Sequence, residues 1–203
     1  MKKIYIARHG ETTWNTTGRT QGSNDTPLSL KGIKQSICMG KRLKEYRIQR
    51  IFTSNLKRSI KTSQVINRFL DVPISITRYL GEMNFGKWEG LTLEQIAEGY
   101  PYQYRLWQTR ADRAVIPNGE TISDVNRRLN SLLDDISQID EEEVLLVTHA
   151  LISKLLIINL LDLNISCLTK LKHNNGGISL VEYRPLNSRL IFYNDTCHLG
   201  RYY

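Results

Sequence analysis

The chain has 203 residues, of which 40% are hydrophobic, and this supports a folded protein with a sizeable core rather than a disordered segment. Its formal net charge is +8, and the excess lies in residues 1–100, which carry 17 Lys and Arg against 8 Asp and Glu. A basic half points to nucleic acid, anionic lipid or a phosphorylated metabolite as partner. The three cysteines are odd in number and form no C-x-x-C pair, which argues against a disulfide framework or a cysteine-rich zinc site.

Apolar periodicity predicts an alternation of strands and helices. In chain order, we expect a strand at 2–7, a helix at 30–46, a strand at 50–53, a helix ending at 69, a strand at 73–79, a helix at 120–136, a strand at 144–147, a helix at 150–161, and two paired strands at 178–183 and 190–193. Hydroxyl or amide oxygens are expected to cap two of these helices, from Ser29 and from Ser54 or Asn55. Residues 80–118 hold Gly, Pro and most aromatic residues, which is typical of a loop with short helices.

No segment has the pattern of a membrane span or a signal peptide. The most apolar stretch, residues 150–163, is interrupted by Ser153, Lys154 and Asn159, and it falls short of the roughly 20 residues that cross a bilayer. The N-terminal apolar run ends at Ala7, which is too early for a signal peptide. Together with thiols that are typical of a reducing compartment, this predicts a cytoplasmic protein that does not bind membranes.

The alternation of strands and helices predicts an α/β fold: a three-layer α/β/α sandwich with a mainly parallel central sheet. The continuous apolar run Val144–Val147 is typical of a central parallel strand that is buried on both faces. We expect one domain over residues 1–203, with residues 80–118 inserted over the ligand site. In such sheets, ligands bind beyond the carboxyl ends of the strands. The segments to inspect therefore follow residues 7, 53 and 147.

These three strand ends carry two arginines and two of the four histidines of the chain: Arg8, His9, Arg58 and His149. The planar guanidinium of arginine matches two phosphate oxygens at once, and Arg58 also falls in the first turn of a predicted helix, where backbone N–H groups favour an anion. Nearby positive charge lowers the pKa of a histidine, and a neutral imidazole has a lone pair that can attack phosphorus. We expect Gly10 to let a substrate approach that imidazole closely.

One alternative to this chemistry and one open question remain at this point. The histidines could bind a metal, although Arg8 would repel a cation and no carboxylate-rich set accompanies them. A phosphoryl transfer also needs a proton donor for the leaving group, normally a carboxylic acid with a raised pKa. Spacing alone leaves Glu11, Glu82 and Glu89 as candidates.

The run Arg8-His9-Gly10-Glu11-Thr12-x-x-Asn15 resembles the signature of the histidine phosphatase superfamily, also called the phosphoglycerate mutase-like family. The resemblance covers nearly the whole chain. Its other blocks follow in family order: Gly18-Arg19-x-Gln21-Gly22-x-x-Asp25-x-Pro27-Leu28, Ser54-Asn55-Leu56-x-Arg58, Glu82-x-x-Phe85-Gly86-x-Trp88-Glu89-Gly90, Pro117-x-Gly119-Glu120, Thr148-His149 and Asn194-Asp195-Thr196-x-His198-Leu199.

The resemblance implies catalysis through a phosphohistidine at His9, without a metal or an organic cofactor. It assigns the phosphate pocket to Arg8, Arg58 and His149, the proton transfers to Glu82, and substrate-binding positions to Asn15, Gln21 and Gly22. Two positions depart from the family pattern. Ala150 stands where glycine is common after the histidine, and we expect its methyl group to be tolerated. Thr121 replaces a frequent serine after Gly119-Glu120, and we expect it to preserve a helix cap.

Within the family, the chain looks more like the small-molecule phosphatases than the mutases. Mutases usually have longer chains and a different sequence after the residue that corresponds to Glu82. It is similar to α-ribazole phosphatases, broad-specificity phosphatases and phosphoserine phosphatases, and a phosphoglycerate mutase activity is the alternative. The leaving group could pack against aromatic side chains, of which the candidates are Trp88, Tyr100, Tyr102, Tyr104 and Trp107.

The predicted partner is a small phosphorylated metabolite. Basic residues in the first half are dispersed and form no run of the nucleic-acid-binding type, so we do not expect nucleic acid as a partner. The alternative to an enzyme is a non-enzymatic protein that binds nucleic acid or has a regulatory role. The sequence leaves the oligomeric state open, and a homodimer is consistent with it.

Overall fold

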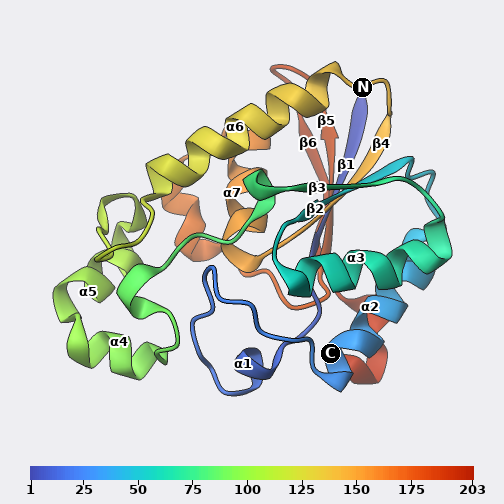
Figure 1. Cartoon of the computed structure of the whole chain (residues 1–203). Coiled ribbons are helices and arrows are strands. Elements are labelled where there is room, and N and C mark those ends of the chain that lie inside the picture. The colour runs from blue at the N-terminus through green and yellow to red at the C-terminus, as the bar shows by residue number, and fades with distance from the viewer.

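A six-stranded sheet forms the middle layer of the computed structural model, which describes residues 1–203 (Figure 1). Its strands follow the order β3-β2-β4-β1-β5-β6. The first four in the chain pair in parallel, whereas β5 runs antiparallel to both β1 and β6. The strand bounds are β1 Lys2–Arg8, β2 Arg50–Ser54, β3 Ile74–Thr77, β4 Glu143–Thr148, β5 Ile178–Tyr183 and β6 Arg189–Asp195.

Helices cover both faces of the sheet. Figure 1 shows α2 (Leu30–Leu43) and α3 (Lys57–Leu70) on one side and α6 (Ile122–Gln138) and α7 (Ala150–Leu160) on the other. This confirms the predicted α/β/α sandwich with a mainly parallel sheet. The remaining helices are α1 (Thr13–Thr16), α4 (Leu93–Gly99), α5 (Pro101–Thr109) and the 3₁₀ helices η1 (Arg78–Leu80), η2 (Gly86–Trp88), η3 (Ala111–Arg113), η4 (Ile165–Lys170) and η5 (Cys197–Tyr202).

The middle residues of the two central strands, 4–7 in β1 and 144–147 in β4, are apolar and buried because both faces of each strand meet a helix layer. In β4, Val144 and Leu146 pack into the core under α6 and α7, whereas Leu145 and Val147 pack into the core under α2 and α3. The same alternation runs along β1, since successive side chains of a strand point to opposite faces. The prediction of a central strand at 144–147 is therefore confirmed.

Helix caps follow the predictions at two positions and depart from them at a third. The Ser29 hydroxyl accepts from the Gly32 N–H at 3.0 Å, and Thr121 forms a capping box at the start of α6. The cap predicted at Ser54 or Asn55 is wrong, because α3 begins at Lys57 and no side chain caps it. Ser54 instead ends β2, and its hydroxyl is bonded to groups of the site described below.

Residues 80–118 hold short helices, as the sequence predicts: η2, α4, α5 and η3 lie within them. Figure 1 shows α4 and α5 beyond the end of the sheet, on the same side as α6. Two of the motif blocks bind one another at the base of this segment. The Asn84 N–H donates to Glu120 Oε2 at 2.8 Å, and the Glu120 N–H donates back to the Asn84 carbonyl at 2.8 Å.

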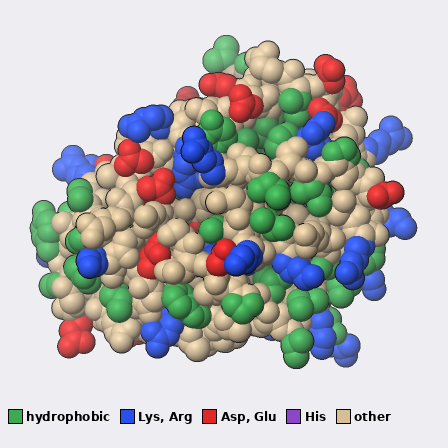
Figure 2. Space-filling view, in the orientation of Figure 1, with side chains coloured by type: hydrophobic (Ala, Val, Ile, Leu, Met, Phe, Trp, Pro, Cys, Tyr) green, Lys and Arg blue, Asp and Glu red, His purple; other side chains and the backbone are tan.

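Basic and acidic side chains are interspersed over the face seen in Figure 2. Part of the basic excess of the first half pairs across the sheet, because β4 lies between β1 and β2. Lys3 lies 3.0 Å from Glu143, and Arg50 lies 2.6 Å from Glu141. Partly exposed pairs of this kind contribute at most about 1 kcal/mol each. None of the helices has both the length and the apolar character that crossing a membrane requires.

Candidate active site

The carboxyl ends of β1, β2 and β4 lie side by side, since Arg8 is in register with Thr148 and Thr53 with Val147. The residues that follow these strands are therefore close in space. The rings of His9 and His149 have centroids 5.1 Å apart, and Arg58 Nε donates to His149 Nδ1 at 3.2 Å. The structure thus brings together side chains that are widely separated along the chain.

His9 is held in one tautomer. Its Nδ1 lies 2.7 Å from the Gly10 carbonyl oxygen, which can only accept, so the proton resides on Nδ1 and the lone pair on Nε2. The side chain is 2% exposed. Burial lowers the pKa of His9 well below its ordinary value, and the charges of Arg58 and Arg8 lower it further. The sequence anticipates only the charge effect, whereas burial is the larger cause.

Arg58 is the second residue of α3, and all three of its side-chain nitrogens donate to fixed acceptors. Nη1 donates to the Asn24 carbonyl at 2.6 Å, Nη2 to the Gly22 carbonyl at 2.7 Å, and Nε to His149. The acceptors are neutral, so they orient the guanidinium without cancelling its charge. The second N–H of each terminal nitrogen remains for a ligand.

Arg8 provides a second buried guanidinium. Its Nη1 donates to the His173 carbonyl at 2.7 Å, and its Nε has no partner in the protein. Burial, with a smaller contribution from Arg58, lowers the pKa of Arg8 to about 10, while Glu82 opposes this shift. Arg8 therefore stays charged at neutral pH, and it forms no ion pair with a carboxylate at short range.

His149 lies behind the pocket rather than at its surface. The side chain is 0% exposed, and both ring nitrogens are engaged by protein groups. Because Nδ1 accepts from Arg58, Nε2 carries the proton and donates to Ser54 Oγ at 2.8 Å. Burial, followed by the charge of Arg58, keeps the pKa of His149 well below its ordinary value. His149 does not line the cleft itself and is joined to it through Arg58.

Among the three candidate acids, the geometry favours Glu82. Burial raises the pKa of Glu82, although the Met83 N–H, Arg58 and Arg8 act against the shift. The other two carboxylates have structural partners. Glu11 accepts from the Ser29 hydroxyl at 2.9 Å, and Glu89 accepts from the loop around Gly22. Of the three candidates, only Glu82 lines the cleft, and burial favours its protonated form.

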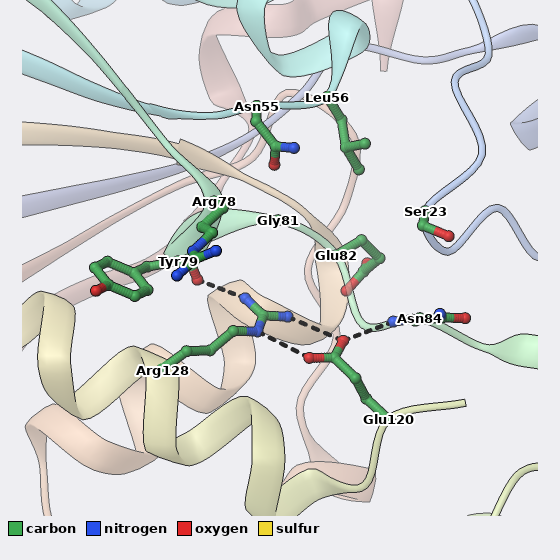
Figure 3. Close-up of a pocket in the computed structure, with 10 residues that line it drawn as sticks. All are labelled: Ser23, Asn55, Leu56, Arg78, Tyr79, Gly81, Glu82, Asn84, Glu120 and Arg128. Atoms are coloured by element: carbon green, nitrogen blue, oxygen red, sulfur yellow. Dashed lines mark hydrogen bonds and ion pairs between the residues drawn. The ribbon is translucent and has the colours of Figure 1, made fainter. Parts of the chain in front are cut away.

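These groups line a cleft of about 470 Å³. The predicted substrate positions Asn15, Gln21 and Gly22 all belong to its wall. The wall carries four cationic side chains, Arg8, Arg19, Arg58 and Lys154, against the single carboxyl group of Glu82. A second cleft of about 420 Å³ shares Glu82 with the first, and its lining includes Arg78, Asn55 and Arg128 (Figure 3).

Two sequence expectations about the cleft need correction. A side chain at Gly10 would meet the Gly32 carbonyl oxygen of α2 at 2.3 Å, so this glycine allows the backbone to pack against a helix rather than a substrate to approach. Of the five aromatic candidates, only Trp107 lines the main cleft, joined there by Phe85. Trp88 is a core residue with 2% exposure, and Tyr102 points to solvent with 69% exposure.

The loop at residues 173–177 is a part of the site that sequence reasoning missed. Besides the His173 carbonyl on Arg8, it supplies Asn175, whose Nδ2 donates to the His9 carbonyl and to Asn15 Oδ1, each at 3.1 Å. The C-terminal motif supports the loop, since His198 Nε2 lies 3.0 Å from the Gly176 carbonyl. The Asn-Asn-Gly-Gly run was the one signal available, and it indicates only a turn.

The arrangement has the parts needed to bind and transfer a phosphoryl group. Two fixed guanidinium groups can neutralise a dianion, and a neutral imidazole in the same cleft presents a lone pair. A buried carboxyl group can supply a proton. No group of three or more His, Cys, Asp or Glu side chains has the geometry to hold a metal ion.

Comparison with known proteins agrees with this geometry. Phosphoserine phosphatase 1 of Hydrogenobacter thermophilus is 27% identical over 204 residues, which cover 100% of this chain and 97% of that protein. The probable phosphoglycerate mutase GpmB of Escherichia coli O1:K1 / APEC is 30% identical over 185 residues, covering 91% of this chain and 86% of that protein. The structure of a mycobacterial glucosyl-3-phosphoglycerate phosphatase superposes with a TM-score of 0.90 and 26% identity, covering 97% of this chain and 100% of that one.

A family model described as the histidine phosphatase superfamily (branch 1) matches residues 4–196. This match confirms the resemblance that the sequence motifs indicate. The chain therefore belongs to the histidine phosphatase superfamily and is an enzyme of the histidine phosphatase type.

Proposed function

We propose that the protein is a metal-independent phosphomonoesterase that hydrolyses a small phosphorylated metabolite through a phosphohistidine at His9. The observation that carries this proposal is the unpaired Nε2 lone pair of a buried, neutral His9 beside Arg8 and Arg58. An imidazole that is protonated at neutral pH has no lone pair on either nitrogen and cannot attack phosphorus. The site therefore favours the nucleophilic form of the ring.

In the first half-reaction, the phosphate dianion of the ester binds to the guanidinium groups of Arg8 and Arg58. His9 Nε2 attacks phosphorus, an N–P bond forms, and the P–O bond to the leaving group breaks. Glu82 gives its proton to the leaving oxygen, so that an alcohol departs and Glu82 becomes a carboxylate. His149 holds the Nε of Arg58 during the transfer.

In the second half-reaction, the Glu82 carboxylate takes a proton from water. The hydroxide attacks the phosphohistidine, the N–P bond breaks, and the electron pair returns to Nε2 of His9. Inorganic phosphate leaves, and Glu82 is again protonated. Burial, which raises the pKa of Glu82, supports its use as acid in one step and base in the next.

Hydrolysis of p-nitrophenyl phosphate in the presence of EDTA tests the reaction class. We expect the wild-type protein to release p-nitrophenol and the His9→Ala variant to lose this activity. Rapid-quench labelling should trap an acid-labile phosphoenzyme on His9, and the His198→Ala variant, which alters a histidine outside the cleft, should still be labelled. Full activity of the His9→Ala variant, or labelling of a serine, would refute the proposed nucleophile.

Identifying the physiological substrate requires a screen of phosphorylated metabolites, including phosphoserine, α-ribazole 5′-phosphate, phosphoglycerates and sugar phosphates. An assay with 3-phosphoglycerate and catalytic 2,3-bisphosphoglycerate separates the two family activities. Phosphate release is expected from this chain. Isomerisation with little phosphate release would instead identify a mutase.

A further inference from the structure

Lys154 is a cationic residue of the cleft that the reaction above does not use. It belongs to α7, one turn beyond Ala150, and both residues line the cleft that contains His9 and Glu82. Its Nζ donates to the Leu168 carbonyl at 3.2 Å, and it forms no ion pair with a carboxylate. An ammonium group has three donors, so two N–H groups remain unassigned.

The environment of this ammonium group is unfavourable without an anion. Burial lowers the pKa of Lys154, and the positive charge of Arg8 lowers it further, while Glu82 acts in the opposite direction. A partly buried charge that lacks an ionic partner is costly, and an anionic ligand beside it would offset that cost. The local electrostatics thus favour a ligand anion in addition to the phosphoryl group.

The shape of the cleft agrees with a second binding position. A further cavity of about 390 Å³ adjoins the main cleft, and the two share Leu93, Trp107 and Lys154. The phosphoryl group is bound at the end formed by Arg8 and Arg58. A leaving group that extends from this end toward the shared residues passes Lys154.

We propose that Lys154 determines specificity by binding a second anionic group, a carboxylate or a second phosphate, on the leaving group of the substrate. This inference rests on the proposed phosphomonoesterase function. It selects, among phosphomonoesters, those whose alcohol carries another negative charge.

Three other cations compete with Lys154: Arg19 of the same cleft, and Arg78 and Arg128 of the cleft drawn in Figure 3. Arg19 is exposed, and its Nη1 donates to the Gly90 carbonyl at 2.6 Å. Arg128 is neutralised, because its Nε lies 3.2 Å from Glu120 Oε1 and its Nη1 donates to the Tyr79 carbonyl. Arg78 is exposed, so water and salt screen its charge. Lys154 is the better anion receptor because it is less exposed than Arg19 and Arg78 and, unlike Arg128, has no acidic partner.

Two matched pairs of substrates isolate the second anion. The carboxylate pair is 3-phosphoglycerate and glycerol 3-phosphate, which differ in one terminal group. The phosphate pair is propane-1,3-diol bisphosphate and its monophosphate. We expect the wild-type protein to show a higher kcat/KM for the second-anion member of at least one pair. In the Lys154→Met variant this preference should fall by about 10-fold or more, the size expected for a lost charge-assisted hydrogen bond.

The ratio of the kcat/KM values for two substrates, measured on one protein preparation, does not depend on how much of the variant is folded. The Lys154→Arg variant should retain the preference, because it keeps the charge. The exposed Lys170 provides a matched control, and the Lys170→Met variant should leave both the preference and the activity unchanged. If the lysine binds the anion equally in the ground state and the transition state, the loss appears in KM rather than in kcat.

The inference is overturned if the wild-type protein shows no preference in either pair, or if the preference survives in the Lys154→Met variant. It is also overturned if the Arg78→Met variant abolishes the preference while the Lys154→Met variant keeps it. In each of these outcomes the wild-type protein still hydrolyses p-nitrophenyl phosphate, and the proposed function stands. Absence of that hydrolysis would refute the proposed function and this inference together.

Discussion

Replacing Glu89 with alanine is expected to lower activity by releasing the loop that orients Arg58. The Glu89 carboxylate is the centre of four contacts in this region. It accepts from the Ser23 N–H at 2.8 Å, the Ser23 hydroxyl at 2.9 Å, Asn24 Nδ2 at 2.6 Å and the Phe85 N–H at 3.1 Å. Alanine removes all of these acceptors at once.

The effect on activity follows from what the loop holds. Two of the three acceptors of the Arg58 guanidinium are the carbonyl oxygens of Gly22 and Asn24. A hydrogen bond to a charged group is worth about 1.5–3 kcal/mol, but the loop donors are exposed and can bond to water instead. We therefore expect the Glu89→Ala variant to lose about 2 kcal/mol of transition-state stabilisation, which corresponds to a decrease of about 30-fold in kcat/KM.

The assay is kcat/KM for p-nitrophenyl phosphate, measured for the Glu89→Ala, Glu89→Gln and wild-type proteins. The Glu89→Gln variant should be intermediate, because glutamine keeps one acceptor oxygen but turns an N–H₂ group toward the loop donors. Glu98 is exposed and provides a matched control, so Glu98→Ala should retain wild-type activity. A kcat/KM within about 3-fold of wild type for Glu89→Ala would show that Arg58 is fixed without this loop.

Three further predictions concern stability. Burial raises the folded-state pKa of Glu82, so the contribution of this side chain to folding stability is complete at low pH and is lost as the pH rises through that pKa. The Glu82→Gln variant should therefore have a higher Tm than the wild-type protein at pH 8 but not at pH 4. Equal Tm values at pH 8 would contradict this. Burial lowers the pKa of His173 from 6.5 to about 3, so between these two pH values the wild-type protein should lose about 1.4 kcal/mol of unfolding free energy per pH unit as the pH falls, relative to His173→Gln, in urea titrations. Parallel titration curves would contradict that coupling. The Gly10→Ala variant should lose about 3 kcal/mol or more through its clash with Gly32, whereas Gly99→Ala, in helix α4 with open space around it, should lose no stability by thermal melting.

The strands and helices could be predicted because their burial follows regular periods. The run at 144–147 is apolar on both faces since helices pack on each side, and α6 shows the 3.6-residue spacing of a helix with one buried face. Cap positions were less certain. Ser54 has the right residue type for an N-cap, but its hydroxyl accepts from His149 and from the Leu56 N–H, so it is not free to cap α3.

The positions of His9, Arg58 and His149 could be inferred from the rule that parallel strands end at one edge. The groups that hold these side chains could not. Gly22, Asn24 and His173 act through backbone carbonyl oxygens, which every residue has, and so no residue type reveals them. Lys154 was visible only as an interruption of an apolar stretch, and its place in the cleft depends on how α7 packs.

The way in which Arg8 and Arg58 are held accounts for the chemistry of the site. An aspartate or glutamate partner would orient a guanidinium equally well, but it would cancel the positive charge and raise the pKa of His9 toward its ordinary value. Carbonyl oxygens orient the two arginines and leave their charge in place. That charge then has two effects: it attracts a phosphate dianion, and it helps to keep His9 unprotonated. Binding and nucleophilicity thus have the same physical origin, and this is why a neutral acid such as protonated Glu82, rather than a fixed carboxylate, suits the same cleft.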